Sequence, residues 1–297
     1  MKVYIIIPYR PTSQGGLQSI PGELRQLPDG KWIDSEGKIH EVGECRYGQD
    51  EMIRAIRFIN KNSHYRHHIV MVVDGDVFPD PNYYYKEADN ITILQSKYVH
   101  NGPLSTLAIS RLNAAYLHGI NNIADDEWLC YGYISDLICP KGWDKPIIDS
   151  IKQLGENYVY VPMFTEVKGG MADKIFIGTQ PTPKMIWEDL RKLCSYSLTM
   201  PEPACRYFTE ADISNFIEVS RQYPRPNVII ERPGDRIYGY YAVMFMKAKY
   251  AKKAMMFQPT GQAFDLAFDN RLYTDCGLMK VVVTHSYVFH PFCEFRY

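Results

Sequence analysis

The sequence predicts an α/β protein in which helices cover both faces of an open, mostly parallel sheet. Short apolar runs recur at 3–7, 68–73, 91–94 and 128–133, the first three of them rich in β-branched residues, and segments of helical character separate them. Uniformly apolar strands are typical of parallel sheets that are buried on both faces. Regular alternation of strands and helices favours the same architecture.

The composition is that of a globular protein without a strong electrostatic field. Hydrophobic residues make up 46% of the 297 residues, charged residues 23%, and the formal net charge is −1. No global positive potential would therefore recruit nucleic acid or an acidic membrane surface. The seven cysteines, an odd number without C-x-x-C spacing, indicate reduced thiols. Without a signal peptide or an apolar run of about 20 residues, we expect a cytoplasmic protein with no membrane span.

The first strand, residues 3–7, is uniformly apolar, as a central parallel strand would be. We expect it to end at Pro8, so that Pro8, Tyr9 and Arg10 leave its carboxyl end. Ligands gather at the carboxyl ends of strands in open α/β sheets. Arg10 could therefore face a phosphate group, and the alternative is an ordinary loop arginine.

Residues 13–48 interrupt the alternation of strands and helices. They contain two turn signals, PDG at 28–30 and SEG at 35–37, between short alternating segments. This pattern predicts a β-hairpin insertion. The insertion could act as a flap over a site, or it could have no function.

A helix over 49–62 leads into the second buried strand, 68–73, which ends in Asp74-Gly75-Asp76. The helix is predicted from apolar residues at a helical period with a polar opposite face. An acidic residue at the tip of the second parallel strand can accept hydrogen bonds from a ribose or a base edge. Asp74 and Asp76 also resemble a bare D-x-D metal motif, and a simple acidic turn is the alternative.

The third strand, 91–94, precedes a strong helix over 104–121 that contains Arg111 and Asn113. Taken alone, these two residues have ordinary explanations. Arg111 would be a solvated arginine, and Asn113 would bond to a neighbouring loop.

The fourth strand opens the stretch EWLCYGYISDLICPKGWD, residues 127–144. Asp136 follows Ser135 and stands between two apolar runs, and residues 140–143 break the strand before a helix that starts at Lys145. Burying an ionised carboxylate alone is costly, so Asp136 needs a partner. A divalent cation carrying a diphosphate is one such partner, and a cap on the following turn is the alternative.

Three charged residues are thus predicted at or just beyond the carboxyl ends of parallel strands: Arg10, Asp74 and Asp136. Because these ends lie along one edge of the sheet, we expect the three residues to converge on one crevice. Convergence of separate segments is a stronger indication of a site than any single motif.

The order IIIPYR, VVDGD, SRLNAAY and YGYISDLICPKGWD resembles the family 2 glycosyltransferases with the GT-A fold. The resemblance implies that Asp74, with Asp76 beside it, holds the nucleotide base. It also implies that Arg111 and Asn113, which match an Arg-x-Asn segment of the family, belong to the donor-binding residues, as do Pro8, Tyr9 and Arg10.

The resemblance makes Asp136 the last acidic residue of a D-x-D-type motif, which a Pro-x-Gly-Trp sequence ending at Trp143 follows. It implies a metal ligand at Asp136 and donor contacts at Ser135 and Trp143. The motif departs from the family at its first acidic position, Ile134, and at its middle position, Ser135. A single aspartate remains workable because Mg²⁺ often uses one or two protein carboxylates together with phosphate oxygens.

Residues 261–277 resemble the acidic helix start that supplies the catalytic base in this family. Asp265 matches the expected position best, and Asp269, one turn further on, would share its face. Charge that complements the helix dipole is the alternative explanation of these carboxylates.

Two further segments near the C-terminus extend the resemblance. Residues 236–253 are similar to a family segment that lies near the acceptor and then returns to the sheet. Residues 281–290 look like the last strand, whose terminal histidine can complete the metal shell. His290 matches this histidine better than His285, for which we expect a solvent or core contact.

The middle of the chain, 164–235, has no counterpart in the family. It is rich in proline and predicts two helical segments, 185–194 and 211–221, within an acceptor-side insertion. The whole chain, 1–297, would then form one domain.

The resemblance as a whole implies inverting, metal-assisted transfer of a sugar from a nucleoside diphosphate. A UDP-sugar is the expected donor, and Mn²⁺ or Mg²⁺ is the expected ion. The acceptor would be a hydroxyl group of a carbohydrate, a glycoconjugate or a hydroxylated DNA base.

Three alternatives stay open. A nucleotidyltransferase would share the strand-tip carboxylates, although the loop PYRPTSQGG only half fits the glycine-rich loop of that class. A non-catalytic nucleotide-sugar-binding module is motivated by the incomplete D-x-D motif. A phage-type DNA-modifying glycosyltransferase is suggested by the cluster of Lys247, Lys249, Lys252 and Lys253, although the net charge opposes it. A solvated helix face is the ordinary explanation of such a cluster.

Overall fold

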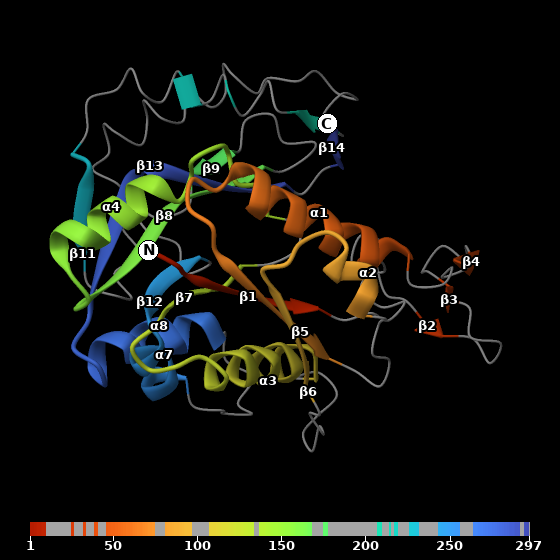
Figure 1. Ribbon diagram of the computed structural model, residues 1–297, viewed down its shortest axis with the longest axis horizontal. Coiled ribbons are helices and arrows are strands. Elements are labelled where there is room, and N and C mark those ends of the chain that lie inside the picture. Colours follow the sequence, from red (N-terminus) through yellow and green to blue (C-terminus); the bar gives the residue numbers. More distant parts are fainter. Residues whose placement is uncertain are drawn as a thin grey trace.

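The computed structural model describes residues 1–9, 46–74, 81–96, 107–133, 137–167, 226–231, 243–255 and 264–291. It also describes short pieces at 25–26, 32–33, 39–40, 175–177, 207–209, 214, 217–218 and 294–296. Within these residues the chain forms a mixed α/β structure, in which helices lie on both faces of one large sheet (Figure 1).

Nine strands of the described part form the main sheet, in the order β11-β13-β8-β12-β7-β1-β5-β6, with β9 paired to β8. Their bounds are Tyr4–Tyr9 (β1), His68–Asp74 (β5), Ile91–Ser96 (β6), Trp128–Tyr131 (β7), Tyr158–Val167 (β8), Ile175–Ile177 (β9), Val228–Glu231 (β11), Met244–Lys247 (β12) and Met279–Pro291 (β13). β1, β5, β6, β7, β8 and β13 all run in the same direction, and β9, β11 and β12 run against them. The predicted mostly parallel sheet is therefore confirmed.

Helices bury an apolar cluster on each face of this sheet. One cluster lies under α1 (Arg46–Asn62), α2 (Pro81–Tyr85) and α4 (Lys145–Leu154), and the other under α3 (Leu107–Asn121), α7 (Ala248–Ala254) and α8 (Phe264–Thr274). In β1, Ile5 and Ile7 belong to the first cluster and Ile6 to the second. This alternation explains why the strand is apolar at every position, since both of its faces are buried.

β1 continues two residues further than the sequence predicts. Pro8 was expected to end the strand, but both Pro8 and Tyr9 lie within it, opposite Val72 and Val73 of β5. The register between β1 and β7 ends at Ile5, so Pro8 lies beyond the part of β1 that has a strand on both sides. A proline is tolerated there because it has no amide hydrogen to offer to a second neighbour.

The predicted β-hairpin insertion corresponds to a separate antiparallel sheet of three short strands, β2 (Arg25–Gln26), β3 (Trp32–Ile33) and β4 (Ile39–His40). Of the two helical segments predicted in the acceptor-side insertion, 185–194 lies outside the described residues. Within 211–221, residues 214 and 217–218 are described, and they are helical. β10 (Tyr207–Thr209) pairs in parallel with β14 (Glu294–Arg296).

Gly119 marks a close approach of α3 to the sheet. A Cβ atom at this position would lie 2.8 Å from Cγ2 of Ile6 in β1 and 3.0 Å from Cγ2 of Val72 in β5. Both contacts are to branched side chains in a packed core, which cannot move away at little cost.

We therefore expect Gly119→Ala to lower the free energy of unfolding by about 1–3 kcal/mol, although alanine favours a helix more than glycine does. Denaturant unfolding of the variant measures this effect. Leu112→Ala, at a position of α3 that is 40% exposed, is the matched control and should change stability by less than about 0.5 kcal/mol. Equal stabilities of wild type and Gly119→Ala would contradict the close packing.

Candidate active site

The ends of β1 and β5 lie side by side at the carboxyl edge of the sheet. The parallel register pairs Tyr9 with Val73, and Asp74 is the last residue of β5, opposite Ser96 of β6. The backbone therefore brings two of the predicted segments together, those that carry Tyr9 and Asp74. Of the predicted residues that follow these strands, Arg10 and Asp76 lie outside the described residues, and for Asp74 only the backbone is described.

Tyr9 itself is a buried residue, 5% exposed. Its hydroxyl accepts a hydrogen bond from the hydroxyl of Tyr84 in α2 at 3.2 Å, and the two rings meet edge to face. Tyr9 therefore joins the end of β1 to α2, and this contact fixes the point at which the chain leaves the sheet.

The segment after Asp136 joins the strand that carries His290. Ile138 and Phe289 form an isolated antiparallel bridge, in which each amide donates to the other residue's carbonyl, at 2.8 Å and 2.9 Å. Asp136 and Ser135 lie outside the described residues, and only the backbone of His290 is described. The two predicted metal ligands thus belong to segments that are far apart in the sequence and that the backbone joins.

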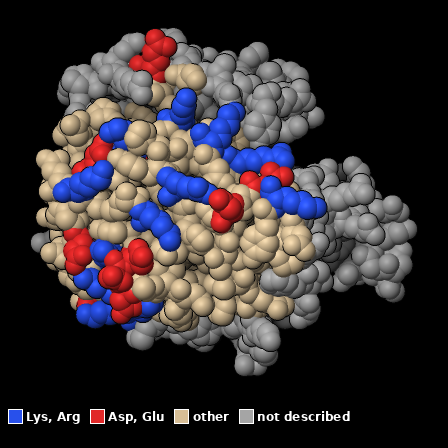
Figure 2. All heavy atoms as spheres, viewed as in Figure 1, with Lys and Arg blue, Asp and Glu red and all other residues tan. Residues whose placement is uncertain are grey.

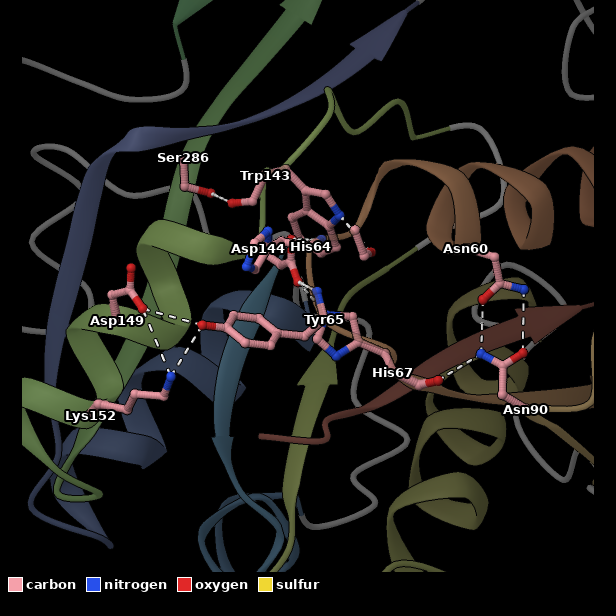
Figure 3. A network of polar contacts seen from close by, with 11 residues as sticks. Asn60, His64, Tyr65, His67, Asn90, Trp143, Asp144, Asp149, Lys152 and Ser286 are labelled. Carbon is pink, nitrogen blue, oxygen red and sulfur yellow. Dashed lines mark hydrogen bonds and ion pairs between the residues drawn. The ribbon is translucent and has the colours of Figure 1, made fainter.

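The turn after this bridge is fixed in the core by Trp143. The indole is 2% exposed, and its ring lies 6.1 Å from that of Tyr133 and 5.6 Å from that of Phe245. Its N–H donates to Oγ of Ser63 at 3.0 Å (Figure 3). Such burial favours a structural role for Trp143 over the direct donor contact that the resemblance implies.

Asp144 is an anchor that the sequence analysis missed. Its fully buried carboxylate accepts hydrogen bonds from the amides of His64 and Tyr65, at 2.6 Å and 2.9 Å. Nε2 of the buried His67 lies 2.8 Å from the same group (Figure 3). An aspartate directly before a helix that begins with Lys-Pro signals an N-cap, but the side chain makes no hydrogen bond to its own helix. It connects α4 to the loop between α1 and β5.

The surroundings of Asp144 lower its pKa. Burial alone would raise it, but hydrogen bonds from His67 and from the amides of His64 and Tyr65 favour the ionised form more strongly and hold the pKa below its usual value. A carboxyl whose pKa is lowered in the folded state stabilises the fold above its ordinary pKa. That contribution is lost as the pH falls through the folded-state pKa.

We expect Asp144→Asn to lower the free energy of unfolding by about 3 kcal/mol at neutral pH, because it leaves the amides and His67 without their charged partner. The difference from wild type should shrink as the pH falls below the ordinary pKa of an aspartate, about 4, and on through the lower folded-state pKa of Asp144. Urea unfolding across a pH series measures both effects. Asp149→Asn, which removes a half-exposed surface pair with Lys145, is the control and should cost less than about 1 kcal/mol. A stability difference that is small, or independent of pH, would contradict this role.

α3 contacts the end of β7 through Tyr116. The hydroxyl of Tyr116 donates to the carbonyl of Tyr133 at 3.0 Å, and its ring lies 4.5 Å from that of Tyr131. One turn earlier on α3, Asn113 is 4% exposed, and its Oδ1 has no hydrogen-bond partner within the described part of the chain. A buried acceptor without a partner is unusual and calls for an explanation. Only the backbone of Arg111 is described.

α8 lies against the same end of β7. The ring of Phe268 is 4.6 Å from that of Tyr131, which is the last residue of β7. Asp265 stands in the first turn of α8, three residues before Phe268, and only its backbone is described. Through Phe268, α8 therefore lies against the strand that precedes the D-x-D-like segment.

Asp269 has a different environment from the one predicted for a catalytic base. It is fully buried, and its carboxylate lies 3.0 Å from Nζ of Lys280, near the start of β13. Lys280 is fully buried too and is also 3.7 Å from Glu231 of β11. This buried cluster favours a structural role for Asp269, which fixes α8 to the sheet. Asp265 stays the predicted base.

The basic cluster on and before α7 is largely paired with acidic residues. Lys249 lies 2.7 Å and Lys247 3.8 Å from Glu156, and Lys252 lies 2.6 Å from Asp125. On the face drawn in Figure 2, positive and negative side chains lie interspersed. These pairs remove most of the support that the lysines gave to a nucleic-acid acceptor.

Three further features concern the described residues as a whole. Among the described side chains, to which those of Asp136 and His290 do not belong, no three of His, Cys, Asp or Glu lie close enough together to hold a metal ion. None of the described helices has the length and apolar character that crossing a membrane requires. Cys130, Cys139 and Cys276 are free thiols.

Comparison with solved structures supports the fold. TarS of S. aureus, residues 1–349, matches with a TM-score of 0.50 at 10% sequence identity, over 98% of this chain and 60% of that one. The same protein in complex with UDP matches with a TM-score of 0.45 at 10% identity, over 98% of this chain and 60% of that one. The chain thus spans less than two thirds of the structures it resembles. No protein-family model matches the sequence, and no curated protein matches it. The chain has a mixed α/β fold of the GT-A-like kind found in glycosyltransferases.

Proposed function

We propose that this protein is a glycosyltransferase that moves a sugar from a nucleoside diphosphate to an acceptor hydroxyl, with inversion at the anomeric carbon. One observation carries the proposal. Within a GT-A-like sheet, the bridge between Ile138 and Phe289 joins the segment after Asp136 to the strand of His290. Functional sites are typically assembled from separate segments that meet at one edge of a sheet.

Binding of the donor falls to residues at the ends of β1 and β5 and on α3. Asp74 and Asp76 would accept hydrogen bonds from the nucleoside, for which uridine is the expected base, and Arg10 would face the diphosphate. Asn113 supports this arrangement, since its buried Oδ1 has an unused capacity to accept a hydrogen bond.

A carboxylate together with phosphate oxygens suits a hard divalent cation. Asp136 and His290 would hold Mn²⁺ or Mg²⁺, with phosphate oxygens as the remaining ligands. When bound, this ion would neutralise the charge that develops on the departing diphosphate. The role of the protein would be to hold the carboxylate of Asp136 and the imidazole of His290 on two segments that are joined. The Ile138–Phe289 bridge is consistent with that role.

Asp265 would act as the general base. Its place in the first turn of α8 lets the helix dipole favour the ionised carboxylate. This carboxylate would take the proton of the acceptor hydroxyl as the oxygen attacks the anomeric carbon on the face opposite the leaving diphosphate. The carbon–oxygen bond to the diphosphate breaks as the bond to the acceptor forms, and attack from the opposite face inverts the configuration.

A panel of nucleotide sugars tests this proposal. We expect one UDP-sugar, with Mn²⁺ present, to raise the melting temperature of the protein. The same donor should be consumed with release of UDP, as its sugar passes to an acceptor or, slowly, to water. A donor that binds without any turnover would instead indicate a non-catalytic binding module. Release of inorganic pyrophosphate from a nucleoside triphosphate would indicate a nucleotidyltransferase.

A further inference from the structure

β13 contains a bulge halfway along its length. Its register with β8 pairs Val283 with Pro162 and then Tyr287 with Met163, so residues 284–286 have no counterpart in β8. Extra residues of this kind bend a strand and turn the side chains that follow, and they are common beside functional sites.

The bulge reverses which positions of β13, odd or even, lie on each face of the sheet. Before it, Val282 belongs to the core under α3 and Val283 to the core under α1. After it, Phe289 belongs to the core under α3 and Val288 to the core under α1. An odd number of added residues reverses the alternation of a strand. The bulge therefore determines the face on which the last positions of β13 fall, position 290 among them.

Ser286 connects this bulge through a hydrogen bond to the turn that follows Asp136. It is fully buried, and its hydroxyl donates to the carbonyl oxygen of Trp143 at 2.6 Å (Figure 3). The Ile138–Phe289 bridge lies a few residues after Ser286 in β13 and a few residues before Trp143 in the other segment. Two ties, one from a side chain and one from the backbone, thus hold the end of β13 against the segment after Asp136. Thr284, at the other end of the bulge, bonds instead to the carbonyl of Pro226 at 2.6 Å, beside β11.

We propose that Ser286 is a positioning residue of the metal and diphosphate site. By fixing the bulge to Trp143 it holds the end of β13, which carries position 290, against the segment that follows Asp136. The inference rests on the proposed function, and Ser286 acts through the two segments that it joins, without contact to the donor.

The test is the affinity for UDP, measured by calorimetry with and without Mn²⁺. Ser286→Ala should lower the Mn²⁺-dependent affinity about tenfold and leave the Mn²⁺-independent affinity nearly unchanged, as the loss of a residue that orients a metal ligand does. Ser150→Ala removes a similar bond from a buried serine hydroxyl to a backbone carbonyl within α4, and Thr284→Val removes the other anchor of the bulge. Both controls should stay within about twofold of wild type. Ser286→Cys keeps the shape of the side chain, with a somewhat larger atom in place of the hydroxyl oxygen, and weakens its hydrogen bond, so it should show the same selective loss even if the alanine variant folds poorly.

The outcomes separate this inference from the proposed function. If wild type binds UDP with Mn²⁺ and both Ser286 variants bind it equally well, Ser286 is not a positioning residue, while the proposed function stands. An equal loss in Thr284→Val would overturn the inference too, because the effect would then belong to the bulge as a whole. If wild type binds no nucleotide with or without Mn²⁺, both the inference and the proposed function fail.

Discussion

Asp136→Asn is expected to reduce sugar transfer by about 10²–10³-fold, because it removes the carboxylate that would hold the metal ion against the departing diphosphate. The fold should remain intact. Initial rates at saturating donor and Mn²⁺, together with the melting temperature of each protein, measure the two effects.

The control for this variant is Asp125→Asn. Asp125 is an acidic residue on the surface that pairs with Lys252, and its loss should leave the rate unchanged. Near-normal turnover by Asp136→Asn would exclude the metal role of Asp136. A rate lost together with the cooperative melting transition would instead assign Asp136 to the stability of the fold.

Asp265→Asn is expected to lower transfer by about 10²–10⁴-fold while the affinity for UDP is preserved, since an amide cannot accept the acceptor's proton. Single-turnover transfer and UDP calorimetry on the same protein separate the two properties. The matched variant is Asp269→Asn, on the same helix.

Asp269→Asn should behave in the opposite way. It breaks the buried pair with Lys280 and should cost about 3 kcal/mol of folding free energy, with a much smaller effect on the chemical step in the protein that remains folded. If Asp269→Asn abolishes transfer at unchanged stability while Asp265→Asn remains active, the base is Asp269.

The strands and helices that were predicted most accurately are those whose signal lies within their own stretch of sequence. β5 and α1 follow from a short apolar run and from apolar residues at a helical period, and both end where the sequence predicts, at Asp74 and Asn62. The position of β12 could not be predicted in this way. It runs antiparallel between β7 and β8, and its neighbours are selected by packing between segments far apart in the chain.

The candidate site was predictable at the level of strand ends and not at the level of side-chain surroundings. A parallel sheet places the ends of β1 and β5 at one edge, so Asp74 could be assigned to that edge from topology alone. The burial of Trp143 and of Asp269 depends on which neighbours face them, and residue type does not reveal this. Asp144 was missed for the same reason, because its partners lie in a loop far away in the sequence.

A crystal structure of the protein with UDP and Mn²⁺ tests the central claim most directly. We predict an anomalous peak for a manganese ion coordinated by Asp136, His290 and diphosphate oxygens, with the uridine beside Asp74 at the carboxyl ends of β1 and β5. A manganese ion or a uridine bound away from this edge of the sheet would contradict it.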